Sequence, residues 1–146
     1  MKKNFIVLLF LSSFCFAQKA DEDAVKESVE KLFVGMKNAD SKIVESAFTE
    51  NAILQSISKE GILRTGELKE FVSSISGFSN GDLDEKIRYA SIEIDGNLAS
   101  VFTPYEFYLK GKFSHCGANS FQLVKQNDAW KIQYLIDTRR KENCQK

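Results

Sequence analysis

Two residues in this chain combine a side chain suited to chemistry with a position inside an apolar strand. His115 is the only histidine. Its imidazole has an ordinary pKa near neutrality, so it could act as a general base. Tyr105 could donate a hydrogen bond to a developing oxyanion. Together they would suit proton transfer of the isomerase or dehydratase kind, provided the fold brings both to one ligand.

Several other chemistries lack their motifs in this sequence. It contains no GxSxG turn, no phosphate-binding glycine loop, and no CxxC or Cys/His cluster. Hydrolase-type nucleophiles, nucleotide sites and zinc sites are therefore not expected. We expect no metal and no cofactor. The 20 basic and 20 acidic residues argue against nucleic acid as a partner, because phosphate binding requires a basic face.

The C-terminal half alternates between apolar and polar residues, as strands do. Strands are predicted over residues 86–94, 97–109, 113–124 and 130–138. A two-residue turn at Asp95-Gly96 is a strong hairpin signal. We expect a three-residue turn after the second strand and a two-residue turn after the third. The segment is therefore predicted to form an antiparallel meander.

The turns also determine which residues pair across strands. Thr103 is predicted to face Arg88 on one side and Asn119 on the other, and Tyr105 to face Gly117. Paired residues share a face of the sheet, and this face is mostly apolar, which predicts burial. Polar residues on a buried face are the informative ones. The predicted ligand-binding residues on this face are Arg88, Thr103, Tyr105, His115, Gly117, Asn119 and Tyr134.

Two positions depend on further assumptions. Gly117 is expected to leave room for a ligand where another residue would project a side chain. Asp137 falls on the opposite face by this register. A β-bulge near Leu135 would bring it inside, because one inserted residue reverses the alternation. Asp137 is therefore a ligand-binding candidate on that condition.

Each candidate also has a purely structural interpretation. An inward tyrosine can pack and bond its hydroxyl to the protein. Asn119 can satisfy the neighbouring backbone or Thr103. His115 can lie in solvent near a strand end, and Arg88 can extend past the apolar face to water. Trp130 is expected to pack in the core beneath the last hairpin.

Helices are predicted in the N-terminal half. Residues 21–36 carry one apolar stripe at helical spacing. Asp40 can cap a short second helix, and Thr65 can cap a third. Short strands are expected over residues 52–57 and 62–64. This order predicts an α+β fold in which three helices cover one face of a curved antiparallel sheet.

Residues 1–17 have the layout of a secretory signal peptide. Two lysines precede the apolar run Phe5–Phe16, and Ala17 follows it. Cleavage after Ala17 predicts export, to the periplasm or outside the cell, and one mature domain over residues 18–146. No stable membrane anchor is expected, because the run is shorter than the roughly 20 residues that span a bilayer. An uncleaved anchor and lipidation at Cys15 are the alternatives.

Two cysteines remain after such cleavage, Cys116 and Cys144. An oxidising compartment permits a disulfide between them. Spacing alone cannot place the two sulfurs within bonding range. The preferred interpretation is therefore that Cys116 is a small buried hydrophobe and Cys144 a free thiol in the tail.

Two segments resemble a known superfamily. Leu123–Ile132 (LVKQNDAWKI) resembles a hairpin shared across the NTF2-like superfamily, and His115–Phe121 (HCGANSF) resembles its small exported members, named SnoaL-like or putative lumazine-binding. The resemblance covers nearly all of the mature chain. It implies a cystatin-like cone, in which three N-terminal helices close the concave side of the sheet and leave a pocket. It also implies a possible homodimer through the outer sheet face.

Three functions remain open, because the superfamily includes isomerases, dehydratases, cyclases, binding proteins and transport adaptors. The favoured hypothesis is binding of a small organic molecule without chemistry. It is favoured because the inner face offers one ionisable base and no dependable second carboxylate to divide acid and base roles. The alternatives are an isomerase or dehydratase that uses His115 and Tyr105, and a structural dimerisation module.

Overall fold

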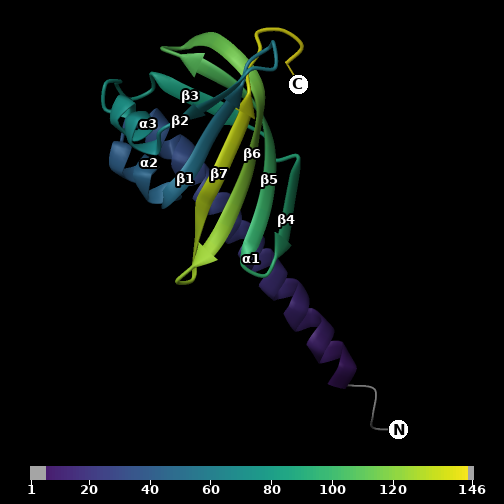
Figure 1. The fold of residues 1–146 in the computed structure, drawn as a ribbon. Coiled ribbons are helices and arrows are strands. Elements are labelled where there is room, and N and C mark those ends of the chain that lie inside the picture. The colour runs from purple at the N-terminus through teal and green to yellow at the C-terminus, as the bar shows by residue number, and fades with distance from the viewer. Residues whose placement is uncertain (1–5, 145–146) are drawn as a thin grey trace.

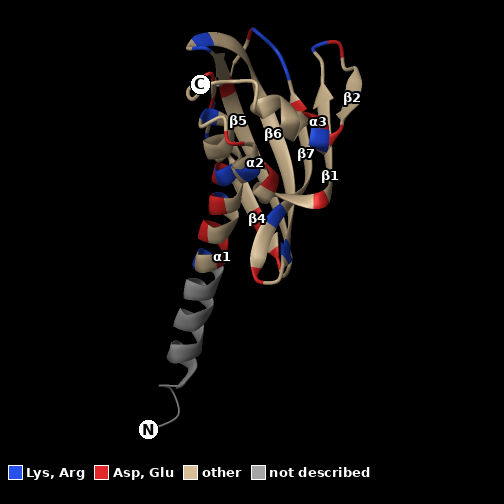
Figure 2. Cartoon of the chain, turned by 90° about the vertical axis from the view of Figure 1, so that its left-hand side faces the viewer, with Lys and Arg blue, Asp and Glu red and all other residues tan. Residues whose placement is uncertain are grey.

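The computed structural model describes the backbone of residues 6–144 and the side chains of residues 19–144. The predicted signal peptide, residues 1–17, lies outside the part whose side chains are described. Among the described residues, no helix is long and apolar enough to span a membrane. Figure 2 shows acidic and basic residues interspersed along the helices and strands.

Within residues 6–144 three helices form, as the sequence predicts. They are α1 (Ile6–Lys37), α2 (Ser41–Ala47) and α3 (Leu68–Ile75). The apolar stripe of α1 is buried, with Val25 and Val29 fully enclosed. Asp40 caps α2, because its Oδ1 accepts hydrogen bonds from the backbone N–H groups of Lys42 (3.0 Å) and Ile43 (3.1 Å). These contacts satisfy donors that the first helical turn leaves unpaired.

The predicted cap of the third helix is wrong. Thr65 lies in a strand, and the residue before α3 is Glu67, whose side chain makes no capping hydrogen bond. Thr65 instead accepts a hydrogen bond at its Oγ1 from the side chain of Gln55 (3.0 Å). The sequence favours the cap because threonine is a good cap in general, but strand pairing with Gln55 takes precedence.

A seven-stranded sheet forms most of the rest of the described chain. Its strands are β1 (Phe48–Ile57), β2 (Leu63–Gly66), β3 (Leu83–Ile87), β4 (Ser91–Asp95), β5 (Leu98–Leu109), β6 (Lys112–Gln126) and β7 (Ala129–Thr138). Their order is β2-β1-β7-β6-β5-β3, with β4 also paired to β5. Only the β1–β7 pair is parallel among the described strands. The sheet is strongly curved, and the helices gather on one side of it (Figure 1). The predicted α+β class is confirmed.

The central β5–β6 pairing has the predicted register. Thr103 pairs with Asn119, and Tyr105 with Gly117. The expected three-residue turn is in fact a two-residue turn at Lys110-Gly111, whose positive φ angles suit a tight hairpin. A bulge next to Phe107 adds one residue, so the register beyond it matches the prediction.

The β3–β4 region differs from the single strand predicted. The register against β5 shifts by one residue between β4 and β3, so the faces exchange. Ile87 pairs with Tyr105, and the N–H of Arg88 donates to the carbonyl of Pro104 (3.0 Å). Arg88 is exposed and lies on the outer face, so its predicted place beside Thr103 is wrong.

A second bulge, in β7, reverses the predicted faces there. Leu123 pairs with Ile132, but the next residue of β6, Gln122, pairs with Tyr134. Tyr134 is therefore on the outer face, where its hydroxyl donates to Oε1 of Gln55 (2.6 Å). Its predicted inward position is wrong. The same bulge brings Asp137 inside, opposite Asn119.

The C-terminal tail is fastened to the sheet. Cys116 and Cys144 form a disulfide, with their Cα atoms 5.7 Å apart. The preferred interpretation of two free cysteines is therefore wrong. Beyond β7, Arg140 exchanges two backbone hydrogen bonds with Cys116 (2.8 and 2.9 Å). This backbone pairing brings the tail close to Cys116. Sequence spacing alone could not predict that proximity.

Replacing Cys144 with serine should lower the free energy of unfolding by about 3 kcal/mol. The disulfide closes a loop that spans 28 residues of sequence. Opening such a loop gives the unfolded chain more conformational entropy, which stabilises the unfolded state by about 3 kcal/mol. Urea unfolding of the oxidised wild-type protein and of Cys144→Ser measures the difference in their free energies of unfolding. Wild-type protein reduced with a dithiol is the control and should match the variant. Equal stability of all three would contradict a bridge in the native protein.

Candidate functional site

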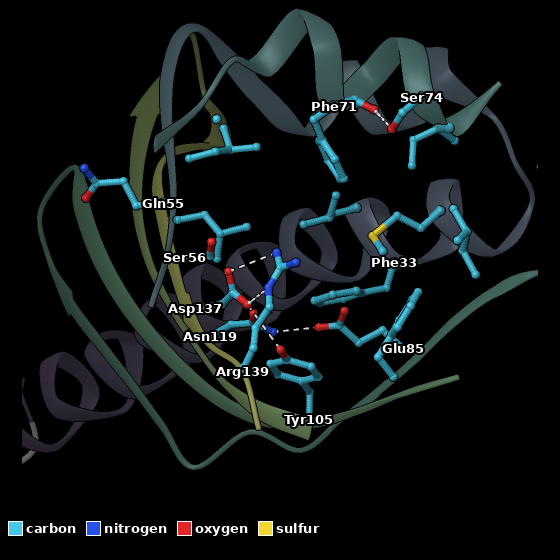
Figure 3. A pocket seen from close by; sticks show the side chains of 18 of the residues that line it. Phe33, Gln55, Ser56, Phe71, Ser74, Glu85, Tyr105, Asn119, Asp137 and Arg139 are labelled. Carbon is cyan, nitrogen blue, oxygen red and sulfur yellow. Dashed lines mark hydrogen bonds and ion pairs between the residues drawn. The ribbon is translucent and has the colours of Figure 1, made fainter. Parts of the chain in front are cut away.

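A cavity of about 370 Å³ lies between the helices and the concave face of the sheet. Much of its wall is apolar and comes from α1, α3 and the strands opposite. Figure 3 shows Phe33 and Phe71 directed toward its interior. The volume is within the range of small-molecule pockets. The larger apolar side chains of the wall include Phe33, Met36, Phe71, Phe78, Leu83 and Phe107.

Polar groups converge at one end of the cavity. Glu85, Tyr105, Asn119, Asp137 and Arg139 all line it and lie together in Figure 3. They come from β3, β5, β6, β7 and the residue after Thr138. The register shift at β3 places Glu85 on the inner face of the sheet, and the bulge in β7 places Asp137 on the same face. The site therefore has an apolar body and one polar end.

Glu85 is the most perturbed acid in this cluster. The amide of Asn119 donates to Oε1 of Glu85 (2.8 Å). Burial is the main reason that the pKa of Glu85 rises to about 7, and the charge of Asp137 raises it further. The Asn119 hydrogen bond and the charge of Arg139 oppose the rise. Glu85 can therefore carry or release a proton near neutral pH.

Asp137 and Arg139 form an ion pair beside Tyr105. The Nε of Arg139 lies 2.7 Å from Oδ2 of Asp137, and its Nη2 lies 3.4 Å from Oδ1. The hydroxyl of Tyr105 donates to the same Oδ2 (3.2 Å) and to the carbonyl of Thr138 (3.0 Å). Burial, followed by the charge of Asp137, raises the pKa of Tyr105 far above its usual value. Tyr105 is therefore a neutral hydrogen-bond donor.

His115 lines the same cavity. Its ring packs edge-on against Tyr105, with centroids 5.7 Å apart, and lies 5.1 Å from Phe107. Burial, and then the charge of Arg139, lowers the pKa of His115. The histidine is therefore neutral at physiological pH. Its Nδ1 lies 3.1 Å from the hydroxyl of Ser114.

Two predicted site residues are close to the polar cluster but do not line the cavity. Thr103 is fully buried beneath it, and its Oγ1 accepts a hydrogen bond from Asn119 (3.4 Å). At Gly117, a Cβ atom would lie 1.7 Å from the carbonyl oxygen of Thr138. The backbone at the end of β7 thus fills the space expected to hold a ligand, so the expectation for Gly117 is wrong.

The structure therefore brings Tyr105, His115, Asn119 and Asp137 into one cavity, and leaves Arg88 and Tyr134 outside it. The cavity also contains residues that sequence reasoning missed. They are Glu85, Arg139 and Arg64. Glu85 would have been found by allowing a bulge in the predicted strand 86–94. Arg139 was missed because a charged tail is normally expected to fray.

Comparison with known proteins supports this architecture. Residues 20–134 match the model of a family described as putative lumazine-binding. No protein with a curated description matches the chain. An NTF2-like protein of unknown function from Shewanella baltica OS155 has 22% identity and a TM-score of 0.67, over 83% of this chain and 94% of that one. At such identity the likeness shows the fold alone.

Two further solved structures agree. A domain of unknown function with a cystatin-like fold from Nostoc punctiforme PCC 73102 has 19% identity and a TM-score of 0.64, over 83% of this chain and 78% of that one. An NTF2-like protein of unknown function from Methylobacillus flagellatus KT has 16% identity and a TM-score of 0.66, over 83% and 93%. The fold is therefore that of the NTF2-like proteins. Because the family model spans most of its length, the chain belongs to the putative lumazine-binding family.

Proposed function

We propose that this protein binds a small organic molecule in the cavity between its helices and sheet. The observation that carries the proposal is the combination of an apolar wall with converging polar groups at one end. Apolar surface supplies affinity, and a few fixed polar groups supply orientation. The family description makes a lumazine one compound to test.

A pair of neighbouring serines on α3 allows a matched test. Ser74 is exposed and lines the cavity, whereas Ser73 is also exposed and does not line it. A tryptophan at position 74 should fill the cavity mouth without disturbing the core. Native mass spectrometry of protein from its source should detect a bound molecule in wild type and in Ser73→Trp, and lose it in Ser74→Trp. Retention by all three would place the ligand elsewhere.

Proton-transfer catalysis is the second candidate, and Glu85 specifically favours it. The sequence offers one base, His115, but the cavity has Glu85 with a pKa of about 7 near the Tyr105 hydroxyl. A base with a pKa near the working pH and a neutral donor could divide the two roles. Conversion of the co-purified molecule, followed by NMR and lost in Glu85→Gln, would favour an enzyme. Recovery of that molecule unchanged would favour binding alone.

We also propose that the chain is exported after cleavage of residues 1–17. The Cys116–Cys144 disulfide supports this, because such bonds persist in oxidising compartments. The mass of the exported form should correspond to a protein that begins at Gln18. A mass that includes Met1–Ala17, or an added diacylglycerol, would contradict this. A homodimer through the outer sheet face stays a prediction.

A further inference from the structure

The guanidinium of Arg139 has unused hydrogen-bonding capacity inside the cavity. Its Nε and Nη2 contact Asp137, and no hydrogen bond of Nη1 is found within the described part of the chain. The side chain is 57% exposed, whereas that of Asp137 is 11% exposed. Figure 3 shows the guanidinium extending from Asp137 into the cavity, near Ser56. Asp137 thus orients a cationic group toward any bound molecule.

A second arginine borders the same end of the cavity. Arg64 lies on β2, lines the cavity, and is exposed. Ser56 of β1 pairs with Arg64 on one side and with Asp137 on the other. The three residues therefore form a row across neighbouring strands on one face of the sheet. Arg64 takes part in no ion pair among the described residues.

The charges around the cavity do not cancel near neutral pH. Asp137 and Arg139 offset each other as a pair. His115 is neutral, because burial lowers its pKa, and Glu85 is largely protonated below pH 7, because burial raises its pKa. Among the residues that line the cavity, Arg64 therefore contributes one positive charge that no other lining residue offsets. An apolar cavity with one excess positive charge is complementary to one negative charge on a mostly apolar molecule.

We propose that the ligand is a monoanionic organic acid, with its carboxylate at Arg139 and Arg64 and its apolar body against Phe33 and Phe71. This rests on the proposed function, since it names the ligand class of the same cavity. Arginine suits the role because its planar N–H groups match the two oxygens of a carboxylate. A protonated Glu85 adds a further donor at this end and does not repel the anion.

The proposal predicts a particular pH dependence. The charged or polar groups that face Glu85 are Asn119 of β6, Asp137 of β7, Arg139 after β7, and Tyr105 of β5. As the pH rises through about 7, Glu85 ionises and its charge repels a bound anion. Affinity for a carboxylate should therefore fall above neutrality, whereas affinity for an amine should rise.

Three probes with the same apolar body test the inference. They are naphthoate, naphthylmethanol and naphthylmethylamine, which place an anionic, a neutral and a cationic group on one ring system. Calorimetry at about pH 6 should show naphthoate binding about tenfold tighter than the alcohol, and the amine weakest. Raising the pH to about 8 should weaken naphthoate binding severalfold in wild type and leave it unchanged in Glu85→Gln.

Arginine variants supply the matched comparison. Arg64→Gln, at an exposed position, should remove most of the preference for naphthoate over the alcohol, because it weakens naphthoate binding far more than alcohol binding. Arg139→Gln should do the same if the variant remains folded. Arg88→Gln is the control, because Arg88 is exposed on the outer face and should not affect either probe.

The outcomes separate this inference from the proposed function. If the alcohol or the amine binds as tightly as naphthoate, the preference for an anion is wrong while the pocket still binds small molecules. The same conclusion follows if Arg64→Gln and Arg88→Gln behave alike. If none of the three probes binds, the proposed function and the inference fail together.

Discussion

Gly117→Ala is expected to destabilise the protein by about 3 kcal/mol or more. A Cβ atom at this position would lie 1.7 Å from the carbonyl oxygen of Thr138 and 2.9 Å from Cε1 of Tyr105. The first contact is with backbone, which cannot rotate away as a side chain can. The end of β7 would have to move, although Thr138 accepts a hydrogen bond from Ala118 and Arg140 exchanges two with Cys116. Overpacking of this kind belongs to the severe end of single substitutions.

Gly66→Ala is the matched control. Gly66 also lies in a strand, a Cβ atom added there would meet no atom within 4 Å, and its φ angle is not positive. Its substitution should change the free energy of unfolding by no more than about 0.5 kcal/mol. Urea denaturation of the two variants and wild type measures both values. Similar small effects at both positions would show that the approach of Thr138 to Gly117 is looser than described.

The pairing of β5 with β6 could be predicted from the sequence because two local features agree there. Alternation of apolar and polar residues defines the faces, and the Lys110-Gly111 turn limits the register. An incorrect turn length and an unforeseen bulge compensate each other. Thr103, Tyr105, His115 and Asn119 therefore share a face as expected, although Thr103 lies beneath the cavity wall and not in it.

The two carboxylates of the cavity, Glu85 and Asp137, could not be placed from the sequence as firmly as the residues of β5 and β6. Each depends on a one-residue irregularity in pairing, at the β3–β4 junction for Glu85 and in β7 for Asp137. An irregularity of this kind follows from sheet curvature and long-range packing, and it leaves no local sequence signal. Arg139 lies just after β7, where its backbone N–H donates to the carbonyl of Ile57, a long-range contact that sequence spacing alone cannot predict. Long-range effects therefore decide most of the polar end of the site.

These corrections alter the comparison between binding and catalysis. The sequence favours binding because its predicted inner face offers no dependable second carboxylate. The cavity contains two, Glu85 and Asp137, and they differ in environment. Asp137 has a cationic partner at 2.7 Å, whereas the hydrogen-bond donor to Glu85 is the neutral amide of Asn119. Two acids in different environments can divide the acid and base roles of a proton transfer. Experiments on Glu85 therefore best separate binding from catalysis.

Glu85→Gln is expected to stabilise the protein at alkaline pH. In the folded state the pKa of Glu85 is about 7, above the ordinary value of 4.5. A raised pKa means that its contribution to stability is fully present below about pH 4.5 and is lost as the pH rises to about 7. At about 1.4 kcal/mol for each pKa unit, the loss reaches about 3 kcal/mol at pH 8. Glutamine can keep the contact with Asn119, because its amide oxygen can accept the hydrogen bond that Oε1 accepts now.

Urea unfolding at several pH values measures this effect. Between about pH 5 and pH 8, the stability of Glu85→Gln relative to wild type should rise by about 2 to 3 kcal/mol. Glu93→Gln, on the exposed side of β4, is the control and should follow the wild-type profile. A constant difference between Glu85→Gln and wild type across this range would mean that Glu85 ionises at its ordinary pKa. In that case Glu85 would be a charged group at neutral pH, and neither proton transfer by Glu85 nor the pH-dependent preference for an anion would be expected.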